Sequence, residues 1–379
     1  MTDRRRLVVD GANGFVGVNM VARALLDHPG REVVALSRGG PERMRAALDD
    51  AVILQDLGAT VSTEALQLVD YTLTEPQLGL DADQLAAVFG QPCDYWHVAA
   101  MLDFSPMPVS ELLATNVDGT RHAVDAFLAH APPGSRFFQV SSAYSCGHIG
   151  DVAREMWYPE APPSAFRTYY ESTKRQGELV VREARERHGL DASIIRLGQV
   201  VGSAVSGLST SDFGIYDFLR DMRRLTDRRP GEDVRIAAAV DSTLNLVPID
   251  TLVGWLHGLA AADDLARLDP PIVHVVDGEA VPTTEFAVAV SRHLPVRMRI
   301  VTDEEMAGTE TTLLERLVAA RLSYSGRYVA QRLDFARDNL VALLGPLPPS
   351  VKPDVLDRIV GTFFDTLDQT QADDERRHA

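Results

Sequence analysis

Lysine is nearly absent from this chain of 379 residues. Of its 37 basic residues only Lys174 and Lys352 are lysines, and the other 35 are arginines. Positive charge is scarce as well, because 54 acidic residues give a formal net charge of −17 at pH 7. Nucleic acids and anionic membranes select cationic surfaces, so this composition argues against both as general partners. A background so rich in arginine rarely supplies lysine by chance, which makes each lysine informative.

Cysteines and long apolar runs are also few. Two cysteines, Cys93 and Cys146, make neither a disulfide framework nor a zinc site. No apolar run approaches the roughly 18 residues that a membrane-spanning helix needs, and no signal peptide follows the first residues. We therefore expect a reduced, soluble, cytoplasmic protein that holds no metal and does not insert into membranes.

Short apolar segments alternate with helix-like segments through the first half of the chain. We expect strands at residues 7–10, 33–36, 95–100, 137–142, 192–197 and 272–276. This alternation predicts βαβ units and a parallel sheet covered by helices on both faces. The predicted fold is α/β, a Rossmann-type doubly wound parallel sheet with a smaller, mainly helical C-terminal substrate lobe.

The alternation weakens after about residue 200, and this change suggests the domain boundaries. We expect residues 1–200 to form the Rossmann core. Residues 201–300 should supply segments of the substrate lobe, interleaved with the last core strands. Residues 301–368 should form a C-terminal helical segment, and the charged residues 369–379 are expected to be a disordered tail.

Three glycines directly follow the first expected strand and open the first helix. Gly11 allows a tight turn, Gly14 lets a pyrophosphate approach the backbone, and Gly17 permits close packing of helix on strand. A glycine triplet alone is a weak signal, but this position makes it a specific indication of dinucleotide binding. The expected cofactor contacts in this turn are Gly11, Asn13, Gly14, Phe15, Val16 and Gly17.

The end of the second expected strand bears on which dinucleotide is bound. An acidic residue about 20 positions past the last glycine binds the ribose of NAD, whereas an arginine suits the 2′-phosphate of NADP. Here Ser37 and Arg38 occupy that place and no carboxylate does. A guanidinium recognises phosphate by its charge and its fork of donors. The sequence therefore favours NADP(H) over NAD(H), with a solvated loop arginine as the alternative interpretation of Arg38.

Tyr170 and Lys174 are four residues apart and would share one face of a helix. With 9 tyrosines and two lysines in 379 residues, only about 0.05 such pairs are expected by chance. An ammonium favours the phenolate, so we expect the pKa of Tyr170 to be lowered and its phenol to exchange a proton near neutral pH. Lys174 could also reach the ribose hydroxyls of a bound nicotinamide cofactor.

Two serines, Ser141 and Ser142, end the expected strand at 137–142. A hydroxyl at this place can donate a hydrogen bond to a substrate carbonyl oxygen as charge develops on it. We prefer Ser142 for this role, with Ser141 as second choice. The alternative is that either serine merely caps the strand end.

The glycine pattern, the serines and Tyr-x-x-x-Lys together resemble the extended short-chain dehydrogenase/reductase superfamily. Further segments resemble its thioester-reductase and fatty acyl-CoA reductase branch, the male-sterility-like NAD-binding proteins. These segments are residues 73–80, 97–100 with Phe104 after them, 114–120, 140–144, 212–214 and 246–250. The resemblance covers roughly residues 5–255 and is weaker beyond, where residues 335–344 are similar to a late family segment.

The resemblance implies an NADPH-dependent enzyme that reduces an acyl thioester, on CoA or a carrier protein, to an aldehyde or an alcohol. Ser142 and Tyr170 would hold the developing oxyanion, and Lys174 would tune Tyr170. Asn116 would support Lys174 through backbone and water, although a helix-cap asparagine fits the sequence equally well. The implied further cofactor contacts are Ala99, Ala100 and Lys174, and the implied substrate pocket is Asp103, Phe104, Ser141, Tyr144 and Phe213.

Two positions depart from the family pattern. Asp10 stands where the family usually has a threonine before its first glycine. Tyr71-Thr72-Leu73 stands where it usually has Gly-Asp-Leu, whose aspartate binds adenine, and Asp70 could substitute for that aspartate. No adenylation or carrier domain precedes Met1, so we expect the acyl group to arrive on a separate molecule, CoA or an acyl carrier protein.

Two other functions stay open at this point. A Ser-Tyr-Lys set also serves dehydrogenases and epimerases that act on a ketone, an alcohol or a nucleotide sugar, and Thr72 breaks the pattern of the thioester-reductase branch. A non-catalytic dinucleotide sensor needs neither Tyr170 nor Lys174, so the presence of both disfavours that function.

Overall fold

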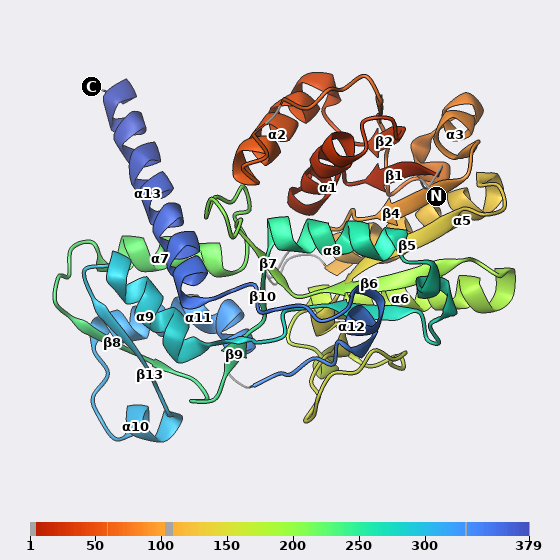
Figure 1. The fold of residues 1–379 in the computed structure, drawn as a ribbon. Coiled ribbons are helices and arrows are strands. Elements are labelled where there is room, and N and C mark those ends of the chain that lie inside the picture. Colours follow the sequence, from red (N-terminus) through yellow and green to blue (C-terminus); the bar gives the residue numbers. More distant parts are fainter. Residues whose placement is uncertain (1–4, 59, 103–108, 330–331, 379) are drawn as a thin grey trace.

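A large parallel sheet forms the centre of the part of the molecule that lies to the right in Figure 1. The computed structural model describes residues 5–58, 60–102, 109–329 and 332–378. Within them, seven strands pair in parallel in the order β11-β6-β5-β4-β1-β2-β3. They are β1 (Arg6–Asp10), β2 (Val33–Leu36), β3 (Leu66–Val69), β4 (Cys93–His97), β5 (Arg136–Ser142), β6 (Ala192–Leu197) and β11 (Ile272–Val275). This topology confirms the predicted Rossmann-type α/β fold.

The strands are rich in apolar residues because helices cover both faces of the sheet. In β1, Leu7 and Val9 belong to one core cluster and Val8 to the other, as the alternation of side chains along a strand requires. The first face carries α1 (Phe15–Asp27), α2 (Gly40–Leu54) and α8 (Ile249–Ala261). The second carries α3 (Ala82–Phe89), α5 (Gly119–His130) and α6 (Tyr169–His188). Ligands can therefore approach the sheet only at its strand ends.

Residues after β6 build a second lobe with its own apolar core. Its helices are α7 (Ile215–Thr226), α9 (Thr283–His293), α10 (Asp303–Ala307), α11 (Leu313–Val329) and α13 (Pro353–His378). Its strands are β8 (Asp233–Ala237) paired with β13 (Arg297–Val301), β9 (Thr243–Leu244) paired with β12 (Val281–Pro282), and β10 (Leu246–Pro248) paired with β7 (Gln199–Val201). The lobe is mainly helical, but short strand pairs contribute to its core.

The chain passes between core and lobe more than once. After the first lobe segments, β11 joins the sheet beside β6, and α12 (Asp338–Leu344) packs against α8 and β11. The remaining short elements are α4 (Val109–Leu113), η1 (Pro76–Gly79), η2 (Ala114–Asp118), η3 (Ala143–Cys146), η4 (Pro163–Ala165) and η5 (Asp263–Arg267). None of the helices in the described part of the chain combines the length and the apolar character that crossing a membrane requires.

The C-terminal residues differ from the sequence-based expectation. Residues 369–378, expected as a disordered tail, continue α13 as helix. Near this end Arg223 of α7 binds Asp368 with 2.7 Å between Nη2 and Oδ2, and the Thr370 hydroxyl donates to the Thr366 carbonyl oxygen. The backbone of residues 369–378 is thus helical and continuous with α13.

The amino ends of the strands carry a buried charge cluster. Asp94, at the start of β4, is fully buried. Its Oδ2 accepts hydrogen bonds from Arg31 Nη2 and Arg136 Nη2, both at 2.9 Å. Its Oδ1 accepts one from Arg136 Nε at 2.8 Å and lies 3.3 Å from Arg5 Nε. The Asp94 carboxylate of β4 thus connects β5 with the segments that precede β1 and β2.

We expect Asp94→Asn to lower the free energy of unfolding by about 1.5–3 kcal/mol, because it removes the buried charge that accepts hydrogen bonds from partly exposed guanidinium groups. Urea unfolding measures this loss. Asp27→Asn is the control, since it breaks the exposed Arg23–Asp27 pair, which contributes about 0.3–0.5 kcal/mol. A loss at Asp94 no larger than the control's would contradict the structural importance of the cluster.

Candidate active site

A cavity of about 930 Å³ extends from the carboxyl ends of the strands into the C-terminal lobe. On the sheet side it is lined by the turn between β1 and α1, the residues after β4, the end of β5 and the first turns of α6. On the lobe side it is lined by residues of α7, β8, α9, β13 and α11. The sheet order reverses between β1 and β4, which is where an open α/β sheet binds its ligand.

The glycine turn leaves room for a ligand against the backbone. Gly11 has φ +58°, and a Cβ there would lie 2.8 Å from the Ala99 Cα. A Cβ on Gly17 would lie 2.4 Å from the Gly11 carbonyl oxygen, so the helix could not pack this close to the turn. Gly14 caps α1 without a side chain. The free N–H groups of the first helical turn therefore offer an anion site, which fits a dinucleotide pyrophosphate.

Asp10 at the end of β1 positions the residues that follow β4. Its Oδ1 accepts hydrogen bonds from the backbone N–H groups of Val98 at 2.7 Å and Ala99 at 2.8 Å. Its Oδ2 lies 2.5 Å from His97 Nδ1 and accepts from the Tyr95 hydroxyl at 2.7 Å. Burial raises the pKa of Asp10, but His97 and these hydrogen bonds outweigh burial and hold the pKa below its usual range. The carboxylate therefore lies behind the cavity wall and fixes the backbone of Val98 and Ala99, which line it.

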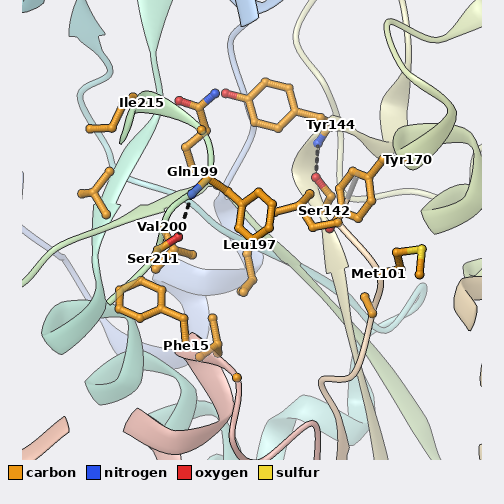
Figure 2. Close-up of a pocket in the computed structure, with 18 of the residues that line it drawn as sticks. Phe15, Met101, Ser142, Tyr144, Tyr170, Leu197, Gln199, Val200, Ser211 and Ile215 are labelled. Carbon is orange, nitrogen blue, oxygen red and sulfur yellow. Dashed lines mark hydrogen bonds between the residues drawn. The ribbon is translucent and has the colours of Figure 1, made fainter. Parts of the chain in front are cut away.

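Ser142, Tyr170 and Lys174 all line the cavity, as the sequence predicts. Figure 2 shows Ser142 and Tyr170 close together on one side of it, with Phe15 and Ile215 toward the other. Lys174 is buried, and its Nζ donates to the Val140 carbonyl oxygen at 2.6 Å. The end of β5 and the first turns of α6 therefore bring the three side chains to one place.

The two serines at the end of β5 differ in what their hydroxyls bind. Ser141 Oγ donates to Glu178 Oε1 at 2.5 Å, so its proton is engaged within the protein. Ser142 Oγ accepts the backbone N–H of Tyr144 at 3.2 Å, which leaves its own proton to donate. This difference supports the preference for Ser142.

Asn116 lies in a π-helical turn, η2, and does not cap a helix. Its Oδ1 accepts the Met101 N–H at 2.7 Å, and its Nδ2 donates to the Met101 carbonyl oxygen and to Thr173 Oγ1, both at 3.0 Å. Thr173 directly precedes Lys174. Asn116 therefore joins the residues after β4 to α6 without lining the cavity.

The remaining predicted residues divide into three groups. Arg38, Ala99, Ala100, Tyr144 and Phe213 line the cavity together with the glycine-turn residues Gly11, Asn13, Gly14, Phe15, Val16 and Gly17. Ser37, which is buried, and Asp70, which is exposed, do not line it. Asp103 and Phe104 lie outside the described residues. Asn13 Nδ2 donates to the Arg38 carbonyl oxygen at 2.9 Å, which joins the ends of β1 and β2.

On the lobe side of the cavity, Phe213 is the one lining residue that the sequence predicted. Phe218, Phe286, Met298 and Ile300 line it, and no motif contains them. Their only signal is the apolar spacing of α7, α9 and β13, which equally predicts residues that pack in a core. Cys146 lies outside the cavity lining, and burial raises the pKa of its thiol to about 11, so it is a poor nucleophile at neutral pH.

The sequence profile described as Male sterility protein matches residues 9–255, about two thirds of the chain. The chain belongs to the male sterility protein family. This assignment confirms the predicted resemblance, and with the geometry of the glycine turn it identifies this end of the cavity as a dinucleotide-binding site.

Several curated proteins are similar to this member of the male sterility family. It is 26% identical over 217 residues to an isonitrile lipopeptide synthase of Streptomyces coeruleorubidus, covering 57% of this chain and 14% of that protein. It is 27% identical over 264 residues to the L-2-aminoadipate reductase large subunit of Penicillium chrysogenum, covering 66% of this chain and 18% of that protein. The chain thus spans less than a fifth of the length of these two relatives.

Solved structures share its fold. The terminal R domain from the myxalamid PKS-NRPS pathway superposes with a TM-score of 0.76 at 20% identity, covering 97% of this chain and 92% of that one. A UDP-glucuronic acid 4-epimerase from Bacillus cereus superposes with a TM-score of 0.65 at 14% identity, covering 96% of this chain and 99% of that one.

Both departures from the male sterility family pattern lie at the same end of the cavity. The Tyr71 hydroxyl accepts the Gly11 N–H at 3.0 Å, and Tyr71 and Thr72 line the cavity whereas Asp70 does not. Burial raises the pKa of Tyr71, and the nearby Asp10 carboxylate raises it further. The cavity wall near Arg38 is therefore formed by a neutral phenol and a hydroxyl rather than by the predicted carboxylate.

The prediction of a lowered pKa for Tyr170 is wrong. Burial raises its pKa, and the Glu171 carboxylate raises it further. The Lys174 ammonium, whose Nζ donates to the Val140 carbonyl oxygen of β5, does not offset these effects. Tyr170 is therefore a neutral phenol at neutral pH, and its hydroxyl keeps its proton.

We expect Lys174 to titrate at a pH far below that at which a free lysine side chain titrates. Burial lowers its pKa to about 8, against the opposing charges of Glu178 and Asp10. The pKa of Lys174 in the unfolded chain is 10.5, so burying the ammonium lowers the free energy of unfolding below about pH 8. This penalty disappears as the pH rises from about 8 to 10.5, because the folded protein then holds the neutral amine. The chain has two lysines, so NMR of protein labelled with ¹³C at the lysine ε-carbon resolves Lys174, with Lys352 as the internal reference. A Lys174 midpoint above pH 10 would contradict this expectation.

Proposed function

We propose that this chain is an NADP(H)-dependent reductase of acyl thioesters, carried on CoA or on an acyl carrier protein, and that it releases an aldehyde or an alcohol. The observation that carries the proposal is the shared cavity, in which Ser142, Tyr170 and Lys174 meet the dinucleotide turn at one end and an apolar lobe at the other. A sensor of dinucleotide would need neither the phenol nor the buried ammonium.

NADP(H) held at the glycine turn would supply the hydride that reduces the thioester carbon. The Ser142 hydroxyl and the neutral Tyr170 phenol donate hydrogen bonds to the carbonyl oxygen as negative charge develops there, and Tyr170 can transfer its proton to that oxygen. The buried Lys174 ammonium adds positive charge beside them. When the tetrahedral intermediate collapses, its carbon–sulfur bond breaks, the thiol leaves with one proton, and the aldehyde remains.

The lobe side of the cavity favours an apolar acyl group. Most of the residues that line it are apolar: Phe213, Ile215, Phe218, Ile236, Leu244, Phe286, Met298 and Ile300. A nucleotide sugar carries a diphosphate that requires cationic or backbone donors. Arg321 is the only cationic side chain among the described residues that line this side. The apolar lining therefore supports an acyl chain rather than a nucleotide sugar.

The relatives support a carrier-bound thioester as the substrate. One similar structure is an R domain of a PKS-NRPS pathway. Another is a thiolation-reductase di-domain of an archaeal non-ribosomal peptide synthetase, in which a reductase domain is linked to a thiolation domain. The alternative is a dehydrogenase or epimerase acting on a ketone, an alcohol or a nucleotide sugar. Its support is the fold shared with the UDP-glucuronic acid 4-epimerase and 29% identity to a dTDP-glucose 4,6-dehydratase of Mycobacterium tuberculosis.

Anaerobic incubation with NADPH and a panel of acyl-CoAs, ketones and nucleotide sugars tests the proposed reaction. We expect free thiol together with aldehyde or alcohol from the acyl-CoAs, detected by mass spectrometry. Tyr170→Phe should lower kcat by about 10²- to 10⁴-fold because it removes the proton donor. Tyr169→Phe, which changes the exposed neighbouring tyrosine, should leave kcat unchanged. Turnover of ketones or sugars without any release of thiol would refute the proposed function.

Arg38 should determine the preference for NADPH. We expect Arg38→Asp to raise the Kd for NADPH by about 10- to 100-fold, since it removes a charge-assisted contact to the 2′-phosphate, and to change the Kd for NADH much less. Fluorescence titration of the bound nicotinamide measures both constants. Arg45→Asp on α2 is the control, because Arg45 makes the same change of charge outside the cavity lining. Equal effects of Arg38→Asp on both cofactors would argue against the phosphate contact.

A further inference from the structure

Helix α6 and strand β5 contact each other through two charged side chains that lie one helical turn apart. Lys174 Nζ donates to the Val140 carbonyl oxygen at 2.6 Å, and the next turn places Glu178 Oε1 where it accepts the Ser141 hydroxyl at 2.5 Å. Successive turns of the helix therefore bind successive residues of the strand. The strand residue that follows is Ser142, and the preceding turn of the helix carries Tyr170.

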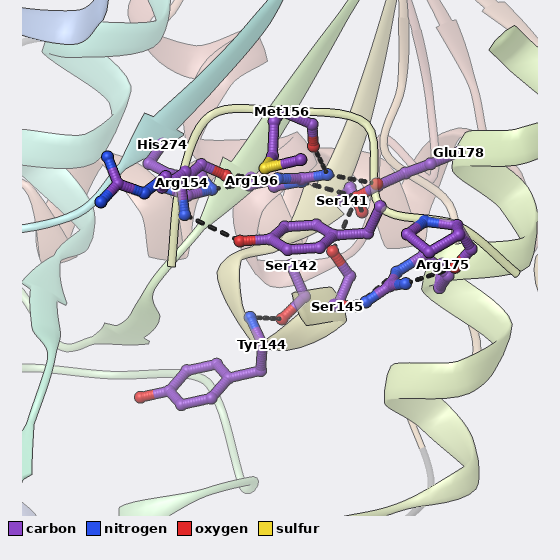
Figure 3. Close-up of polar contacts among 12 residues, drawn as sticks. Ser141, Ser142, Tyr144, Ser145, Arg154, Met156, Arg175, Glu178, Arg196 and His274 are labelled. Carbon is purple, nitrogen blue, oxygen red and sulfur yellow. Dashed lines mark hydrogen bonds and ion pairs between the residues drawn. The ribbon is translucent and has the colours of Figure 1, made fainter. Parts of the chain in front are cut away.

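The Glu178 carboxylate is fully buried and has a defined set of partners (Figure 3). Besides Ser141, the Ser145 hydroxyl donates to Oε1 at 2.8 Å. Arg196 of β6 donates from Nε to Oε1 at 3.0 Å and from Nη2 to Oε2 at 2.7 Å. Burial raises the pKa of Glu178, but Arg196 and the two serines outweigh burial and hold it below its ordinary range. Glu178 is therefore a carboxylate at neutral pH.

Arg196 extends this contact to the loop after η3. It also donates to the carbonyl oxygens of Arg154 at 3.2 Å and Met156 at 3.0 Å. Its side chain is fully buried, and Glu178 is its counter-charge. A shift of α6, β5 or β6 would separate the buried guanidinium from the buried carboxylate and leave both charges unpaired. The pair therefore holds these three elements in one relative position.

Glu178 also acts on the charge of Lys174. Two carboxylates favour the ammonium, Glu178 from α6 and Asp10 from β1, while burial opposes it. Tyr170 lies one turn away on α6, and β5 meets the ammonium with the neutral carbonyl group of Val140.

We propose that Glu178 is a positioning residue for the reaction: by tying the end of β5 to α6, with Arg196 as its charge partner, it sets the separation of Ser142 from Tyr170. Its negative charge also favours the charged form of Lys174. Glu178 does not line the cavity and touches neither substrate nor cofactor in this role. The kinetic part of the test rests on the proposed function, and the titration of Lys174 does not.

The kinetic test compares Glu178→Gln with Glu178→Asp in the full chain. Glu178→Gln should lower kcat by about 10- to 100-fold with little change in KM, because a misplacement on the order of 1 Å has an effect of this size. Glu178→Asp keeps the charge pair with Arg196 but withdraws the carboxylate from Ser141, so its kcat should also fall. Glu183→Gln, on an exposed turn of the same helix where Glu183 pairs with Arg187, is the matched control and should keep wild-type kcat.

Titration of Lys174 by ¹³C NMR separates positioning from a purely structural role. In Glu178→Gln the midpoint of Lys174 should move to lower pH by about one unit, while in Glu178→Asp it should stay near the wild-type value. A variant that unfolds more easily but keeps the wild-type kcat and the wild-type Lys174 midpoint would overturn the proposal.

Failure of the proposed role of Glu178 and failure of the proposed function give different results. If wild-type protein turns over ketones or nucleotide sugars but no thioester, the substrate assignment fails, and the same variants are then measured with the substrate that is turned over. If none of the panel is turned over, the Lys174 midpoints decide. Equal midpoints in Glu178→Gln and wild type would overturn the proposal.

Discussion

The packing of α6 against β5 is the constraint on which the active site depends. A buried ammonium and a buried carboxylate, one turn apart on the helix, each bind the strand, and neither charge is tolerated in the interior without such partners. Helix and strand can therefore adopt only one relative position. That position brings Ser142 at the end of the strand and Tyr170 at the start of the helix to the same cavity.

The two ends of the sheet carry charge for different purposes. At the amino ends, Asp94 joins arginines from neighbouring segments and stabilises the fold. At the carboxyl ends, Asp10 aligns the backbone of Val98 and Ala99 beside the glycine turn and so shapes the wall of the cavity. The C-terminal lobe contributes apolar side chains to the opposite wall. The polar side chains at the strand ends thus face an apolar compartment, which is the basis for proposing an apolar acyl group as substrate.

Most of the core and the centre of the site could be predicted from local sequence. Buried parallel strands are short apolar runs, and the glycine turn and Tyr170–Lys174 pair need particular residues at particular spacings, so they are visible without a structure. The prediction that failed concerns a property that depends on burial as well as on neighbours: the pKa of Tyr170 rises because of burial and Glu171. Two further features have no local signal: Asp70 lies outside the cavity lining, and residues 369–378 continue a helix.

Composition and motif spacing are sufficient to define an α/β dinucleotide-binding protein with a phenol and an ammonium on one helix face. Tertiary structure alone decided that Lys174 points its amine at Val140, that Glu178 and Arg196 form a buried pair beneath the serines, and that residues of α7, α9 and β13 close the cavity. The reason is physical: hydrogen bonding and spacing act within a few residues, whereas burial and charge pairing join residues that are far apart along the chain.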